Sequence, residues 1–305
     1  VFGDDMQFDV IIGNPPYQLN DGGGSGSSSG PIYDRFIRQA KLLQPRMLSM
    51  VIPARWYTGG KGLDEFRKEM ISDQRIRVLE DYFDASEVFP GVDIAGGVCY
   101  FLWDSSHWGP VEISNHFLSQ IQKSSRPLTN NLSETFIRFN EAMDIAERVH
   151  SNGPPRFIDL VSARRPFGLS SMLKLSATPF ENSVYTYAYP SNGYLARNQI
   201  QKNIDWADDW KVMCAKAYGE RGSFPYLVTG KPFVAGPGTV CSETYLVAYR
   251  AHSQAEAERV AQYMRTKFFR FFVLLTKNTQ NAASGVYKMV PAVDFSIDWD
   301  DATLA

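Results

Sequence analysis

The sequence of 305 residues is poor in cysteine and histidine, has no long apolar run and carries a net charge of only −2. Its three cysteines stand far apart, with no CxxC pair and no histidine at ligand spacing, which argues against a disulfide framework or a metal site and favours buried thiols in a reducing cytoplasm. Charged residues interrupt every apolar run, so we expect no membrane span. The first residues, 1–5, contain neither a secretion signal nor an initiator methionine, so a piece of a longer chain is expected.

A net charge near zero hides an uneven distribution along the chain. Residues 1–150 hold 14 Lys and Arg against 20 Asp and Glu, whereas residues 151–305 hold 17 against 13. An acidic part joined to a basic part fits a catalytic domain followed by a domain that binds nucleic acid. The composition changes around the Gly/Pro-rich residues 151–155, and we place a domain boundary there.

Apolar runs alternate with helical periodicity in the first part. The expected strands are 8–13, 47–53, 77–82, 97–103 and 111–113, and the expected helices are 32–43 and 62–70. Strands that alternate with helices and end in consecutive strands predict an α/β fold, in which a partial doubly wound, Rossmann-like sheet has an antiparallel edge. The run 8–13 is typical of a buried parallel strand.

The second part shows short strand signals and a single extended helical pattern. The expected strands are 184–189, 210–214 and 244–249, followed by one helix over 253–275. Ser253 followed by Glu256 is a capping-box pattern for the start of that helix. These signals predict an α+β domain over 151–305.

The clearest chemical signal is Asn14-Pro15-Pro16-Tyr17, directly after the first strand. Methyl transfer to an exocyclic amine is difficult because the nitrogen lone pair is delocalised into the ring. The side-chain carbonyl of Asn14 and the backbone carbonyl of Pro15 are two acceptors for the amino hydrogens, and the prolines fix the loop and remove competing donors. The Tyr17 ring offers a stacking surface for a flipped base. An isolated NPPY can be a simple turn, but its place after a strand favours catalysis.

Several further segments resemble the methylase domain of Eco57I-type, type IIG restriction-modification enzymes. Residues 9–18 resemble motif IV of that family, and 31–36 with 40–41, 48–56, and 89–101 resemble motifs V, VI, and VII with VIII. Residues 165–169, 243–247, 266–270 and 277–281 resemble its target-recognition domain. The resemblance implies that 1–150 is the C-terminal part of a methyltransferase catalytic domain and that 151–305 is a DNA target-recognition domain. It implies transfer of a methyl group from S-adenosylmethionine to the N6 of an adenine flipped out of double-stranded DNA.

The sequence also departs from that family. The Gly-containing cofactor motif and the acidic residue after the second strand, which the family places before motif IV, do not occur upstream of Asp9. We therefore expect a missing N-terminal cofactor-binding half, with or without a nuclease domain, and an isolated fragment without activity. Asn14 is the one residue here that the resemblance places against the cofactor.

The candidate DNA contacts are Arg164, Arg165, Lys277 and Asn278, whose side chains suit phosphates or base edges but equally suit a solvated surface. Cytosine N4 stays an alternative target, although Asn rather than Ser at the first loop position favours adenine by resemblance. Two other functions stay open. One is methylation of RNA or of a protein glutamine by the same loop, and the other is a DNA-binding module without activity of its own.

Overall fold

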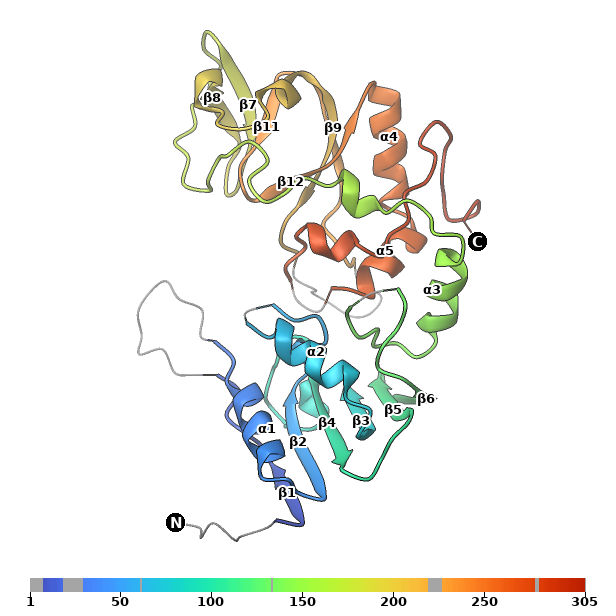
Figure 1. The fold of residues 1–305 in the computed structure, drawn as a ribbon. Helices are drawn as coiled ribbons and strands as arrows, with labels where there is room; N and C mark the ends of the chain where they lie inside the picture. Colours follow the sequence, from blue (N-terminus) through green and yellow to red (C-terminus); the bar gives the residue numbers. More distant parts are fainter. Residues whose placement is uncertain are drawn as a thin grey trace. The chain divides into compact units, whose positions relative to one another are not determined.

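The computed structural model describes residues 8–18, 30–60, 62–132, 134–218, 227–277 and 280–304. The chain forms two compact units, Val1–Glu147 and Arg148–Ala305 (Figure 1). The division falls inside helix α3 (Ala142–His150), a few residues before the boundary expected at 151–155.

The first unit is built around a six-stranded sheet in the order β1-β2-β4-β3-β5-β6. Its strands are β1 (Val10–Gly13), β2 (Met47–Pro53), β3 (Ile76–Tyr82), β4 (Val98–Asp104), β5 (Val111–Phe117) and β6 (Gln120–Arg126). The expected α/β fold is confirmed. β6 is the antiparallel edge, and β4 is a second antiparallel strand that lies inside the sheet between β2 and β3, where it had not been expected.

One face of this sheet carries the core of the first unit. On the paired strands β2 and β4, Leu48, Met50 and Phe101 lie on that face and are buried. Two helices, α1 (Tyr33–Leu42) and α2 (Asp64–Ser72), supply apolar residues to the same core, and the Tyr33 and Phe66 rings meet edge to face 5.9 Å apart. Helix α1 buries Tyr33, Ile37 and Ala40 because that spacing places them on one side of a helix.

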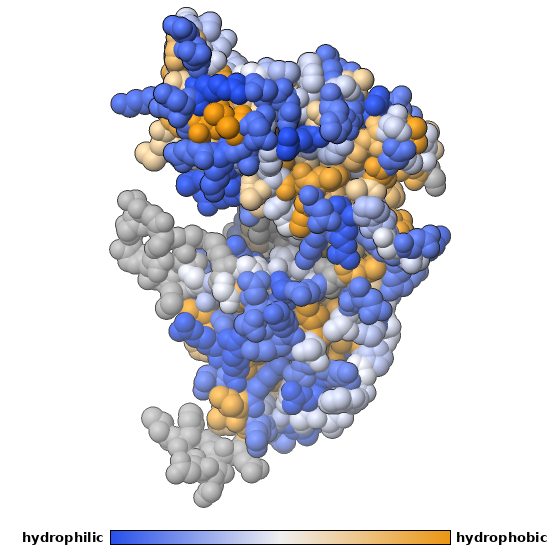
Figure 2. Space-filling model, turned by 45° about the horizontal axis from the view of Figure 1, so that its top comes forward, coloured by the Kyte–Doolittle hydropathy of each residue, from blue (hydrophilic) through white to orange (hydrophobic). Residues whose placement is uncertain are grey.

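Strand β1 differs from the expected buried strand. Among the described residues it pairs only with β2, so it is an edge strand, and Val10 and Ile12 are 48% and 77% exposed. Only Ile11 packs against the core. On the face of the molecule drawn in Figure 2, hydrophobic residues form separate patches within a largely hydrophilic surface.

The second unit contains two three-stranded sheets, β10-β9-β12 and β11-β7-β8. The strands are β7 (Ser183–Tyr187), β8 (Gly193–Ala196), β9 (Trp210–Ala215), β10 (Phe233–Ala235), β11 (Thr239–Cys241) and β12 (Tyr245–Ala251). The three strands expected in this part correspond to β7, β9 and β12. A core that includes Phe167, Val184, Met213 and Val247 joins the two sheets.

The single helix expected over 253–275 is wrong, because the structure forms two helices, α4 (Gln254–Tyr263) and α5 (Lys267–Leu274). Thr266 is the N-cap of α5, and its hydroxyl accepts from the Phe269 N–H and donates to the Tyr263 carbonyl, which ends one helix and starts the next. Ser253 caps α4 as expected, while the Glu256 carboxylate accepts from the His252 N–H rather than from Ser253 itself.

Short 3-10 helices complete both units. They are η1 (Ala54–Tyr57), η2 (Ala85–Glu87), η3 (Phe157–Leu160), η4 (Arg197–Gln199), η5 (Ile204–Asp208) and η6 (Ser284–Tyr287). In the described part of the chain, no helix has both the length and the apolar character needed to cross a membrane.

Candidate active site

The Asn14–Tyr17 loop leaves the carboxyl end of β1. Because β1 and β2 are parallel neighbours, the loop lies at the same edge of the sheet as η1, which follows β2. The antiparallel β4 begins at this edge, and the Ala54 N–H donates to the Gly97 carbonyl 3.0 Å away. The carboxyl edge of the sheet therefore brings together the three segments that follow β1, follow β2 and precede β4.

The loop is anchored at some positions and exposed at others. Pro15 is buried, whereas Asn14 and Pro16 are exposed. The Ile32 N–H donates to the Tyr17 carbonyl at 3.3 Å, and Gln18 forms an antiparallel bridge with Pro31. The predicted acceptor side chain, Asn14, is therefore accessible on a loop that is held at both of its ends.

Tyr17 is half-buried, and its hydroxyl has no hydrogen-bond partner among the described residues. Burial, and secondly the nearby Cys99 thiol, raise the pKa of Tyr17 from 10 to about 12. The phenol is therefore uncharged at neutral pH, as a ring that stacks on a neutral base should be.

Two further buried polar atoms lack hydrogen-bond partners among the described residues, namely the Tyr33 hydroxyl and the Arg55 Nε. Burial is the main cause of the raised pKa of Tyr33. The Cys99 thiol raises this pKa further, whereas the Arg55 guanidinium lowers it. Trp56 and Tyr57, which follow Arg55 in η1, are fully buried. The Trp56 indole donates to the Cys99 sulfur at 3.4 Å. Their role is thus packing rather than lining an open pocket.

A buried ion pair that the sequence did not reveal lies behind η1. The Arg138 guanidinium donates to both carboxylate oxygens of Asp81, at 2.6 and 2.9 Å, and stacks 3.8 Å from the centre of the Phe83 ring. The Tyr57 hydroxyl and the Asn115 amide also donate to Asp81. Asp81 is on β3 and Arg138 is on the segment before α3, so the pair ties η1, the sheet and that segment together. The two residues are 57 positions apart in the chain, so no local sequence pattern indicates that they pair.

The predicted DNA-contact residues occupy different environments. The side chains of Arg164 and Arg165 are 62% and 47% exposed, and both form ion pairs with Glu243. Lys277 is only 3% exposed, which differs from the solvent-facing cation that a direct phosphate contact requires. Asn278 lies outside the described residues.

Cys99, Cys214 and Cys241 are buried free thiols, as expected, and burial raises the pKa of each one. Within the described ranges, no group of three or more His, Cys, Asp or Glu side chains gathers as a metal site would need.

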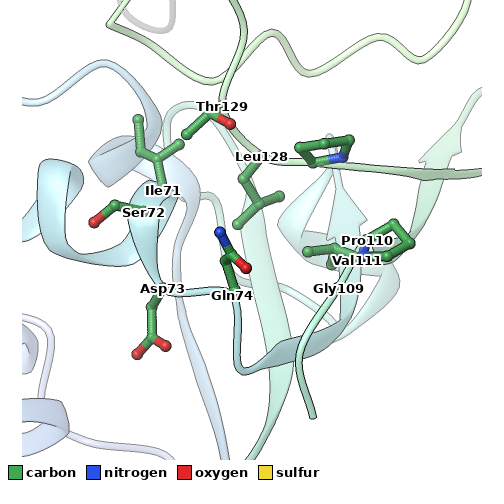
Figure 3. Close-up of a pocket in the computed structure, with 10 residues that line it drawn as sticks. Ile71, Ser72, Asp73, Gln74, Gly109, Pro110, Val111, Leu128 and Thr129 are labelled. Carbon is green, nitrogen blue, oxygen red and sulfur yellow. The ribbon is translucent and has the colours of Figure 1, made fainter.

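A cavity of about 450 Å³ lies at the opposite edge of the first sheet, where β3 and β5 begin (Figure 3). It is lined by Ile71, Ser72, Asp73, Gln74, Gly109, Pro110, Val111, Pro127, Leu128 and Thr129. The cavity lies at the amino ends of the parallel strands, whereas the Asn14–Tyr17 loop follows the carboxyl end of β1. The cavity is therefore separate from the candidate active site.

Comparison with known proteins finds a family match within the first unit. The family model of the Eco57I restriction-modification methylase matches residues 1–89. An uncharacterized adenine-specific methylase of Mycoplasma pneumoniae is 34% identical in an alignment of 157 residues that covers 48% of this chain and 37% of that relative. The chain thus spans little more than a third of the length of the relative.

Solved restriction-modification enzymes show a looser likeness. The alignment with the type IIL enzyme MmeI, solved in complex with DNA, covers 91% of this chain and 44% of the MmeI chain. The sequence identity is 8% and the TM-score is 0.46. The type IIG restriction endonuclease BpuSI covers 90% and 43% at 10% identity, with a TM-score of 0.37. The family match itself rests on residues 1–89, which match the Eco57I restriction-modification methylase family, and for these residues the resemblance predicted from the sequence motifs is confirmed.

Proposed function

We propose that this chain is the target-base part of a site-specific DNA adenine-N6 methyltransferase of a type IIG restriction-modification system, acting in the cytoplasm. The observation that carries the proposal is the loop at the carboxyl end of β1, which holds an exposed Asn14 and, three residues later, the half-buried Tyr17. The 34% identity over 157 residues to an uncharacterized adenine-specific methylase supports adenine as the base.

The loop residues have separate tasks in this proposal. The Asn14 side-chain carbonyl and the Pro15 backbone carbonyl accept hydrogen bonds from the two amino hydrogens, which localises the nitrogen lone pair for attack. Pro15 and Pro16 have no N–H that would compete for these acceptors. The Tyr17 ring stacks against the flipped base and compensates part of the cost of unstacking it from the duplex.

S-adenosylmethionine would supply the methyl group as an electrophile bound to a cationic sulfur. The residues around Asn14 fit the methyl-acceptor side of such a site, because they offer an exposed amide and neutral carbonyl oxygens beside a neutral ring. We place the rest of the cofactor site on a further part of the enzyme, beyond the edge of β1 that is unpaired among the described residues. The exposed apolar side chains of Val10 and Ile12 on this edge strand support such a partner segment.

The second unit is proposed to recognise double-stranded DNA. Residues 151–305 carry 17 Lys and Arg against 13 Asp and Glu, and Arg164 and Arg165 are exposed next to each other. Of the four contacts that the sequence predicts, we propose these two arginines and Asn278, whereas Lys277, which is 3% exposed, does not fit a direct phosphate contact. Arginine is the side chain best suited to bidentate contacts with phosphates and guanine edges.

The proposal is tested by measuring methyl incorporation from labelled S-adenosylmethionine with the intact protein that contains this sequence. Duplex DNA, RNA and a release-factor protein are offered separately, and the product nucleoside is identified by mass spectrometry. We expect N6-methyladenine in DNA. Incorporation into RNA or protein alone would refute the proposal, N4-methylcytosine would correct the base, and DNA binding without any incorporation would favour a recognition module that has no activity.

A further inference from the structure

A single carboxylate in the second unit binds two adjacent arginines. Glu243 Oε2 accepts from Arg164 Nε and Nη2 at 3.1 and 2.6 Å and from Arg165 Nε at 2.9 Å, and Oε1 accepts from Arg165 Nη2 at 3.4 Å. The Ser171 N–H and hydroxyl also donate to Oε1. The hydrogen bonds from Arg165 and then Arg164 lower the pKa of Glu243 from 4.5 to about 2, so it is ionised at neutral pH.

The loop that carries the arginines has a defined backbone. Arg165 has φ +57°, a left-handed conformation that is strained for a non-glycine residue and persists only where its surroundings impose it. The Gly168 N–H closes a turn onto the Arg165 carbonyl at 3.0 Å, and the Asn203 amide donates to the Pro166 carbonyl at 2.7 Å. Phe167 is fully buried beneath the turn.

Glycine is required at the end of this turn. Gly168 has φ +77°, and a Cβ there would lie 2.6 Å from the Cβ of Gln201. The next residue, Leu169, accepts from the Glu243 N–H at 3.0 Å, so the backbone of Glu243 is joined to the same loop as its side chain. The arginines and their carboxylate therefore belong to one fixed unit of structure.

The cluster keeps the capacity to bind another group. The contacts with Glu243 use two of the five N–H groups of each guanidinium, and the two side chains stay 62% and 47% exposed. Two positive charges against one negative charge leave a net charge of +1. An arginine whose position is already fixed loses less conformational entropy when it binds a planar or tetrahedral acceptor, such as a guanine edge or a phosphate.

We propose that Glu243 is a positioning residue that holds Arg164 and Arg165 in one arrangement for selective contact with duplex DNA. This inference rests on the proposed role of the second unit in DNA recognition. Glu243 lowers the local positive charge while it fixes the geometry of both guanidinium groups. It thus favours DNA sequences that match this geometry and weakens charge-driven binding to all others.

The test compares Glu243→Gln with the unchanged full chain. Glutamine keeps the size and one acceptor but removes the charge, so both arginines gain freedom. We expect affinity for a mixed-sequence duplex to rise about 3- to 10-fold at low salt, with a salt dependence steeper by about one phosphate contact. Sequence enrichment from a randomised duplex pool should fall roughly tenfold or more. Glu243→Asp, which keeps the charge, should leave the salt dependence unchanged.

Asp208→Asn is the matched control, because it removes one carboxylate from another arginine pair of the same unit, Arg197–Asp208. It should leave enrichment unchanged. Equal effects of Glu243→Gln and Asp208→Asn, or retained enrichment in Glu243→Gln, would overturn the inference while the DNA-binding function stands. No duplex binding by the unchanged chain, even at low salt, would overturn both.

A second variant keeps the test decisive if Glu243→Gln does not fold. Arg164→Lys combined with Arg165→Lys keeps both charges but removes the planar guanidinium groups. We expect it to lose enrichment and to keep the salt dependence of the unchanged chain. Retained enrichment in this double variant would also overturn the inference.

Discussion

At the scale of single residues, the ring and the hydroxyl of Tyr17 are expected to have separable effects. The buried hydroxyl has no partner among the described residues, so Tyr17→Phe should leave the free energy of unfolding unchanged or raise it by up to about 1 kcal/mol. The same variant should keep most of the methylation activity of the intact enzyme. Tyr17→Ala removes the stacking surface and should lower activity by roughly tenfold.

Urea unfolding and initial methylation rates of the two Tyr17 variants check this prediction. If Tyr17→Phe slowed methylation as much as Tyr17→Ala, the hydroxyl rather than the ring face would be the functional group. The stacking role would then be wrong.

The sequence predicted the place of the Asn14–Tyr17 loop, directly after a strand, better than it predicted the environment of the basic residues. Asn14 to Tyr17 could be placed because a strand and its following loop are adjacent in the chain. Arg164 and Arg165 were predicted as exposed cations, but the carboxylate that binds them is Glu243, and Lys277 is buried. Pairing across such a separation depends on the tertiary fold and leaves no local pattern.

At the scale of elements, the Asp81–Arg138 pair is expected to stabilise the first unit strongly. Both side chains are buried, so removing one partner leaves an uncompensated charge. Asp81→Asn or Arg138→Met should each lower the free energy of unfolding by about 3–5 kcal/mol. Urea unfolding measures this, with Glu69→Gln as the control, because the exposed Arg38–Glu69 pair should contribute about 1 kcal/mol or less. A loss in Arg138→Met no larger than in the control would contradict the prediction.

The break between α4 and α5 gives a second prediction about an element. Thr266 is buried, and its hydroxyl both caps α5 and bonds to the end of α4. Thr266→Ala should therefore lower the free energy of unfolding by about 1–2 kcal/mol. Thr266→Ser keeps the hydroxyl and should recover most of this stability. Equal losses in the two variants would indicate that the methyl group, rather than the cap, is responsible.

The elements that the sequence misjudged share a physical cause. The helical pattern of apolar residues continues across Arg265 and Thr266, so periodicity alone does not show the break. Strand β6 is mostly polar and exposed, so it lacks the alternation that marks a half-buried strand. The position of β4 between β2 and β3 depends on chain topology, since its apolar residues would suit any central place in the sheet.

At the scale of the whole molecule, the two units have separate apolar cores and different charge balances. The composition change at 151–155 lies close to the division between Glu147 and Arg148. The sequence did not show that β1 lies at the edge of the sheet that the described residues form, because an apolar residue such as Ile12 looks the same in a sequence whether it is exposed or buried. The open edge is what our proposal uses to place the rest of the cofactor site.

The most direct test of the account is methylation by the intact enzyme with Asn14→Ala. Removing one of the two proposed acceptors should lower the rate of N6-methyladenine formation on the order of 10² to 10³-fold, as for other preorganised polar groups that act on the reacting centre. Duplex affinity should change little, because the exposed Asn14 is not among the proposed DNA-recognition residues. Methylation at an undiminished rate by Asn14→Ala would contradict the central claim.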